Sequence, residues 1–213
     1  MSRMNVLLAT VFALFLAPLS TSASAATPTY VADMEVTYQE SISVAQIWAR
    51  PGLLRMSASG GRAFTGMITD YRQDKAWALA PAAGKYQQFP VSSLRDHVPH
   101  FFDPALQVVS KKEEGREMVE DRPANRYRVV LDQPGRRGYS GLLWEAVDLP
   151  GYPLRWEDQG QAVVATWKNA ALVDVSDDFF ALPTGYSEQK NTLDGDETPV
   201  GPAAAGETTG PPI

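Results

Sequence analysis

The stretch that decides the fold lies between residues 47 and 89. It reads IWARPGLLRM over 47–56, GMITDYRQDKAWALAP over 66–81 and KYQQF over 85–89. Short apolar and aromatic runs are separated there by turn signals such as Pro51-Gly52, which is typical of strands joined by tight turns. The stretch therefore predicts a meander of short antiparallel strands. It is rich in aromatics and poor in nucleophiles, which favours a concave surface for apolar ligands over an active site.

The rest of the chain repeats this pattern. Apolar and polar residues alternate over 33–39, 126–131 and 163–168, and the last run continues towards Val175. Alternation with period two indicates strands with one buried and one solvated face. A sheet of about ten such strands must curl, split or close to bury its apolar face. We predict a mainly β fold, a curled antiparallel sheet (an incomplete β-barrel) covered by short helices.

Residues 91–106 are the exception to this alternation. Ser92 and Ser93 can cap a helix, and the apolar residues that follow recur at roughly helical spacing. Pro99 and Pro104 interrupt that spacing, which predicts one or two short helices instead of a continuous one. Such a segment suits a lid or plug over the sheet, and it suits a plain connecting helix on the core equally well.

The two ends of the chain differ from the middle in composition. Residues 1–26 combine Arg3, an apolar run over 6–16 and the small residues Ala23-Ser24-Ala25. They predict a signal peptide cleaved after Ala25 or Ala26, because the run is shorter than the roughly 20 residues of a membrane span. Residues 191–213 have one leucine and no aromatic, and predict a disordered tail. Residues 27–190 then form one domain of a periplasmic protein.

Composition excludes several classes of function. The chain has no cysteine, so it has neither a disulfide framework nor a lipid-modified cysteine, and we expect no stable membrane anchor. Its formal net charge is −6. A nucleic-acid-binding protein needs a basic surface, so no nucleic acid is expected as a partner.

Catalytic and metal-binding patterns are weak. His97 and His100 are the two histidines, and no third ligand is marked out for zinc, so we predict no metal and no cofactor. Ser92, Asp96 and His97 are neighbours in the sequence, but no Gly-x-Ser-x-Gly elbow is present. No constellation meets the geometric roles of catalysis, so the protein is predicted not to be an enzyme.

Four motifs in order resemble one family. They are WARPGLLR over 48–55, ITDYRQDKAWALAP over 68–81, GYPLR over 151–155 and DFFALPTGY over 178–186. Together they are similar to the outer-membrane lipoprotein carrier and sorting superfamily (LolA/LolB-like). Because Thr27 to Tyr30 leads almost directly into the first strand, the chain resembles a periplasmic relative that lacks the N-terminal helix.

The resemblance implies an apolar cavity that takes acyl chains. Arg50 matches the family arginine that hydrogen-bonds lid residues, which its five donors make physically sensible. A surface arginine before a turn is the alternative for this position. The residues predicted at the lid and cavity mouth are Arg50, Leu94, His97, Phe101 and Phe102. The cavity-lining candidates are Trp48, Leu54, Met56, Trp77, Trp144, Trp156 and Trp167, although most tryptophans are expected in the core.

The predicted function is non-enzymatic binding of an acyl chain, lipid or lipidated polypeptide, as a lipoprotein or lipid carrier or a chaperone. The alternative is an envelope regulatory or protein-interaction module of the same fold. In that alternative the cavity is filled by the protein's own side chains, and an envelope protein is the partner.

Overall fold

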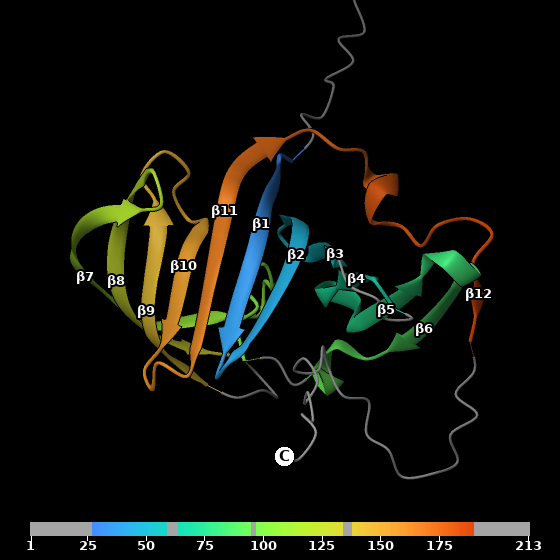
Figure 1. Cartoon of the computed structure of the whole chain (residues 1–213), viewed down its shortest axis with the longest axis horizontal. Coiled ribbons are helices and arrows are strands. Elements are labelled where there is room, and N and C mark those ends of the chain that lie inside the picture. The colour runs from blue at the N-terminus through green and yellow to red at the C-terminus, as the bar shows by residue number, and fades with distance from the viewer. Residues whose placement is uncertain (1–26, 59–63, 95–96, 134–137, 190–213) are drawn as a thin grey trace, which may run out of the picture.

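The computed structural model describes residues 27–58, 64–94, 97–133 and 138–189. The predicted signal peptide and tail lie outside these residues. Within the described residues, twelve strands form one sheet in the order β12-β6-β5-β4-β3-β2-β1-β11-β10-β9-β8-β7. In Figure 1 the curved strands β7 and β8 stand at one side of the sheet, and β6 with β12 at the other. The predicted fold class, a mainly β protein built on a curled antiparallel sheet, is confirmed.

The predicted runs of alternating residues at 33–39, 126–131 and 163–168 each overlap a strand of the structure. Their bounds are β1 Thr29–Tyr38, β2 Ser41–Arg50, β3 Leu53–Ala58, β4 Gly66–Asp70, β5 Lys75–Ala80, β6 Lys85–Phe89, β7 Gln107–Val119, β8 Arg122–Asp132, β9 Tyr139–Ala146, β10 Pro153–Asp158, β11 Val163–Val173 and β12 Ser187–Glu188.

The sheet consists of two meanders joined at its centre. Strands β1 to β6 pair in sequence order, as do β7 to β11, and every pair within a meander is antiparallel. Strand β1 also pairs with β11 and so joins the meanders. Strand β12 lies parallel to β6 at the edge.

Strand register defines two faces. Tyr30 lies opposite Ala49, and Ala49 opposite Leu54. Trp156 lies opposite Ala165, which in turn faces Val36. Because successive side chains alternate between faces, Tyr30 and Val36 share one face of β1. We call this the inner face; it carries most of the hydrophobic core, including the fully buried Tyr30 and Trp156.

One glycine allows β9 and β10 to pack closely on this face. A Cβ at Gly141 would lie 2.1 Å from the carbonyl oxygen of Glu157 and 2.8 Å from Cη2 of Trp156. No side chain fits there without moving the backbone of β10. The absence of a side chain at Gly141 therefore leaves room for the Trp156 ring.

Four 3-10 turns complete the described structure: η1 Tyr71–Gln73, η2 Pro81–Ala83, η3 Val91–Ser93 and η4 Asp177–Phe180. Of the helices predicted within 91–106, the described residues contain η3 alone, and 97–106 form bends and turns. Pro99 and Pro104 explain this, since each removes a backbone donor that a helix needs. The sheet is thus covered by an irregular segment where short helices were expected.

Candidate functional site

The segment that covers the inner face, residues 97–106, is called the strap here. Its backbone is stabilised by local turns, in which Asp103 N donates to His100 O at 2.9 Å and Leu106 N to Asp103 O at 3.0 Å. The Asp103 carboxylate also accepts from Ala105 N at 2.9 Å. The strap therefore holds its shape without being part of a helix or strand.

Aromatic side chains attach the strap to the sheet. The Phe101 ring lies 5.9 Å from the Trp156 ring and 5.7 Å from the Trp167 ring, edge-on to both. The Phe102 ring lies 5.6 Å from that of Tyr30. Such T-shaped and tilted pairs are favourable geometries. Val98 and Leu106 also pack against this core, so the strap fills the concave side of the sheet with apolar groups.

Hydrogen bonds at three places fix η3 and the strap to the rest of the domain. Before the strap, the Asp74 carboxylate accepts from the Ser92 backbone at 2.8 Å and from its hydroxyl at 2.9 Å. In the middle, Gly52 N donates to Phe102 O at 2.7 Å. At the far end, the buried Gln133 amide donates to Asp103 Oδ2.

A pocket of about 290 Å³ opens at the rim of the strap. Its lining residues are His97, Gly138, Tyr139, Ser140, Trp156, Asp158, Gln159, Gly160 and Val163. The His97 ring stacks on Tyr38, with 4.1 Å between centroids. The pocket is at the small end of the range for ligand sites, so it suits a head group better than a long chain.

The cavity-lining candidates divide between the two faces. Trp156, Trp167, Leu54 and Met56 contribute to the inner-face core beneath or beside the strap. By register, the other three tryptophans point to the outer face: Trp48 lies opposite Arg55, Trp77 opposite Ile68, and Trp144 opposite Arg155. Their position as cavity-lining residues stays a prediction.

The residues predicted at the lid and cavity mouth also separate. His97, Phe101 and Phe102 belong to the strap, and Leu94 ends η3, where its amide donates to Val91 O at 2.9 Å. Arg50 pairs with Asp177 at 2.7 Å, and its guanidinium lies 4.6 Å from the Phe180 ring centroid. These contacts place Arg50 against η4, and its predicted role at the cavity mouth stays a prediction.

Two of the motifs quoted from the sequence contact each other around η4. The Trp48 ring lies 5.3 Å from that of Phe179, and the Arg55 guanidinium lies 4.7 Å from the same ring. Arg55 also donates to the Phe179 carbonyl oxygen. Residues of the strand–turn–strand motif at 48–55 therefore hold the motif at 178–186 against the outer face of the sheet.

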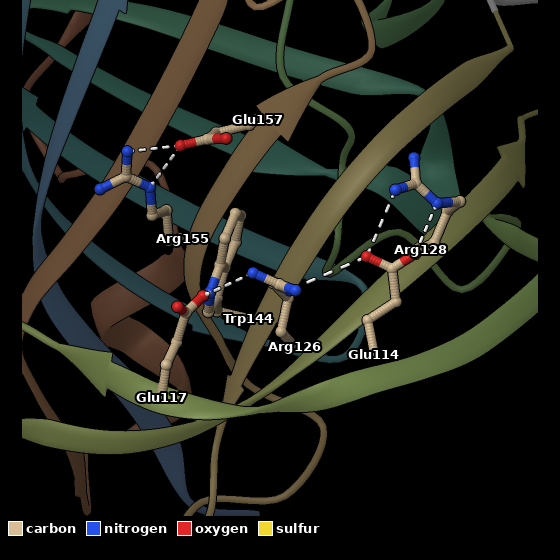
Figure 2. Close-up of polar contacts among 7 residues, drawn as sticks. All are labelled: Glu114, Glu117, Arg126, Arg128, Trp144, Arg155 and Glu157. Atoms are coloured by element: carbon tan, nitrogen blue, oxygen red, sulfur yellow. Dashed lines mark hydrogen bonds and ion pairs between the residues drawn. The ribbon is translucent and has the colours of Figure 1, made fainter.

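The outer face of β7 to β10 carries a ladder of ion pairs (Figure 2). Arg128 pairs with Glu114 at 2.7 Å, and Arg126 with Glu117 at 3.5 Å. Buried Trp144 lies among these charges: its Nε1–H donates to Glu117, and the Arg155 guanidinium lies 5.5 Å from its ring centroid. Arg155 in turn pairs with Glu157. The charges cancel in pairs, so this face does not present the excess of positive charge that an anion-binding surface needs.

Tyr30 is the most perturbed titratable group on the inner face. Its hydroxyl donates to Pro153 O at 2.6 Å, and burial raises the pKa of Tyr30 far above its ordinary value, with the Arg122 charge acting in the opposite direction. No motif or spacing in the sequence singled out Tyr30 or Gln133. A tyrosine at the apolar phase of the first strand was the available signal for Tyr30.

The two histidines have separate environments. His97 is exposed on Tyr38, whereas His100 is buried with its ring 5.2 Å from that of Tyr71. Within the described ranges, no group of three or more His, Cys, Asp or Glu side chains is arranged to hold a metal ion. No helix in the described part of the chain is long and apolar enough to cross a membrane.

No family model and no curated protein matches the chain. Among solved structures it is similar to an uncharacterized conserved protein from Thermus thermophilus, at 13% identity and a TM-score of 0.49, over 78% of this chain and 91% of that one. It is also similar to a LolA superfamily protein from Nitrosomonas europaea, at 12% identity and a TM-score of 0.39, over 73% and 90%. The family predicted from the motifs is thus represented among the structural neighbours.

A third neighbour is the Pseudomonas aeruginosa MucA/MucB complex, at 14% identity and a TM-score of 0.43. The match covers 75% of this chain and 57% of that one, so it spans little more than half of the neighbour's length. All three are likenesses of shape, and residue roles in this chain are argued from its own contacts.

Proposed function

We propose that this protein is a non-enzymatic periplasmic binding protein that holds an acyl chain, a lipid or a lipidated polypeptide on the inner face of its sheet. It would act as a lipid or lipoprotein carrier or as a chaperone for such ligands. One observation carries the proposal: an irregular strap occupies an aromatic concave face with its own apolar side chains. Phe101 and Phe102 stand where the ligand would lie.

Displacing the strap costs little hydrophobic free energy if a ligand replaces it. Each square ångström of apolar surface buried contributes about 25 cal/mol, whichever molecule supplies the covering groups. An acyl chain can therefore exchange with Phe101 and Phe102 on the same surface. The strap acts as an internal competitor, which lowers the apparent affinity and keeps an apolar patch from solvent while no ligand is bound.

The proposal is tested on the protein exported from the full-length chain. Native mass spectrometry with lipid extraction should find a bound acyl species, or a fluorescent fatty acid should bind on titration. Phe101→Ala with Phe102→Ala removes the competing rings and should tighten probe binding by about tenfold. Phe179→Ala is the matched control, because it removes a phenylalanine from the outer face at η4.

The proposal fails if the wild-type mass is free of lipid and neither the wild type nor the double variant binds the probe. Circular dichroism and an unfolding midpoint establish that each variant is folded. If all of them fold and none binds, the strap is a permanent part of the core.

A second candidate function is a regulatory or protein-interaction module of the envelope. It is favoured by the filled inner face, next to which the rim pocket measures only about 290 Å³. Under this hypothesis the strap never leaves, and a partner protein recognises the outside of the domain. Absence of acyl binding, together with a stable complex recovered by cross-linking in the periplasm, would favour it.

A further inference from the structure

Two polar groups lie on the inner face beneath the strap. The Nε1–H groups of Trp156 and Trp167 are both buried, and neither has a hydrogen-bond acceptor among the described residues. The two side chains are 0% and 3% exposed. A buried donor without an acceptor destabilises the fold, and buried tryptophans usually find a partner for this group.

In two other tryptophans the indole N–H has the usual hydrogen-bond acceptor. Trp77 donates to Gln88 Oε1 at 3.0 Å, and Trp144 donates to Glu117. Both lie on the outer face. The unpartnered indoles are the two that contact Phe101, the strap residue placed over the proposed ligand surface.

The two indoles are close enough to act on one ligand group. Trp156 faces Ala165 across β10 and β11, and Trp167 lies two residues further on the same face of β11. Both rings lie within 6 Å of the single Phe101 ring, centroid to centroid. A ligand group that replaced that ring would therefore contact both indole rings.

Charge at the rim restricts the kind of acceptor. Trp156 also lines the pocket, together with the carboxylate of Asp158, whose Oδ1 accepts from Val163 N at 2.7 Å. A second anion beside this carboxylate would be disfavoured by like-charge repulsion. A neutral carbonyl oxygen accepts two N–H groups without that penalty.

We infer that Trp156 and Trp167 bind the neutral acyl carbonyl of the ligand, an ester or an amide, and so select acylated molecules over plain hydrocarbon chains. This inference rests on the proposed function, because the carbonyl reaches the indoles only when the strap yields. The two residues are specificity determinants that hold the polar end of the chain at the inner face.

The test compares methyl decanoate with decyl methyl ether, which replaces the carbonyl by a methylene in a chain of equal length. Nitrogen-15 spectra of the wild-type protein should show the indole protons of Trp156 and Trp167 moving downfield with the ester and staying nearly still with the ether. Binding of N-methyldecanamide is compared with binding of methyl decanoate, which shows whether the indoles bind an amide carbonyl or an ester carbonyl more tightly. Decanoic acid should bind more weakly than its ester.

Substitution supplies the second readout. Trp156→Phe and Trp167→Phe remove the donors and should weaken ester binding about three- to tenfold, the range expected for one hydrogen bond, while ether binding changes little. Phe179→Ala, which removes a ring from the outer face at η4, is the control and should leave both ligands unaffected. If a variant does not fold, the wild-type spectra still decide.

The inference is overturned if the ester and the ether bind equally and move the indole signals equally. In that case acyl binding itself stands and only the role of the carbonyl is lost. If none of these ligands binds and the indole signals never move, the proposed function falls as well.

Discussion

At the scale of single residues, the buried Tyr30 hydroxyl makes the free energy of unfolding depend on pH in the alkaline range. Burial keeps it neutral in the folded protein, with its pKa held above the ordinary value, whereas in the unfolded chain it ionises near pH 10. Above about pH 10 the unfolded state therefore has fewer bound protons than the folded state, and the free energy of unfolding falls as pH rises. Tyr30→Phe should flatten this decline.

The same substitution has an opposite effect near neutral pH. It removes the hydrogen bond to Pro153 O and should lower the free energy of unfolding by about 1 kcal/mol. Urea titrations at pH 7 and at pH 11 measure both effects. An equally steep alkaline decline in the variant would show that other groups cause it.

Trp144 allows a prediction about the ladder of ion pairs. Trp144→Phe keeps most of the buried ring but removes the N–H donated to Glu117, a hydrogen bond to a charged acceptor. We expect a loss of about 2 kcal/mol in the free energy of unfolding by urea denaturation. Trp77→Phe removes a bond to an exposed glutamine and should cost less than about 1 kcal/mol; equal losses would contradict the argument.

The sequence predicted which types of residue surround the proposed cavity better than it predicted which of them face it. Phe101, Trp156 and Trp167 were expected around a cavity, and the structure brings these three together. Trp48, Trp77 and Trp144 look the same in the sequence, yet register places them outside. The phase of a strand relative to its neighbours depends on pairing between distant segments, which local alternation does not encode.

At the scale of elements, the strap is held at its far end by Asp103 and Gln133. Asp103→Ala removes the acceptor of a buried amide and should loosen the strap. Gly52 N donates to Phe102 O, so exchange of the Gly52 amide reports strap opening. We expect about tenfold faster exchange in the variant.

Asp103→Asn is the matched control for that experiment. Gln133 Oε1 has no hydrogen-bond partner among the described residues, so rotation of the Gln133 amide lets the new asparagine donate to it. Exchange of the Gly52 amide should then stay near the wild-type rate. Equal acceleration in both variants would mean that charge, and not the hydrogen bond, holds the strap.

Elements could be predicted from the sequence in proportion to their regularity. The alternating runs at 33–39, 126–131 and 163–168 predicted the strands β1, β8 and β11. The strap was expected to contain short helices because its apolar spacing is roughly helical. Two prolines and the contacts of Phe101 and Phe102 with the sheet decide its real path, and tertiary contacts of that kind override local propensity.

At the scale of the whole molecule, η4 fastens the end of the domain to its first meander. Ending the chain after Val175 removes Asp177, Phe179 and the buried Phe180, with their contacts to Arg50, Arg55 and Trp48. Because a buried phenylalanine alone is worth about 3–5 kcal/mol, the unfolding midpoint should fall sharply. Ending the chain after Lys190 should leave the midpoint within about 2 °C, since the composition of 191–213 predicts no packed core. Calorimetry of both truncated chains checks this.

The junction of β1 with β11 has a consequence for the order of events during folding. Strands β1 to β6 can form hairpins with their sequence neighbours early, but the second edge of β1 pairs only when β11 arrives. The contact between Lys168 and Glu35 across that junction spans 133 residues. Closing so long a loop is slow. Until it closes, the unpaired edge of β1 can form hydrogen bonds with a strand of another chain. The folding protein thus passes through a partly formed stage in which one edge of β1 is exposed to pairing with other chains.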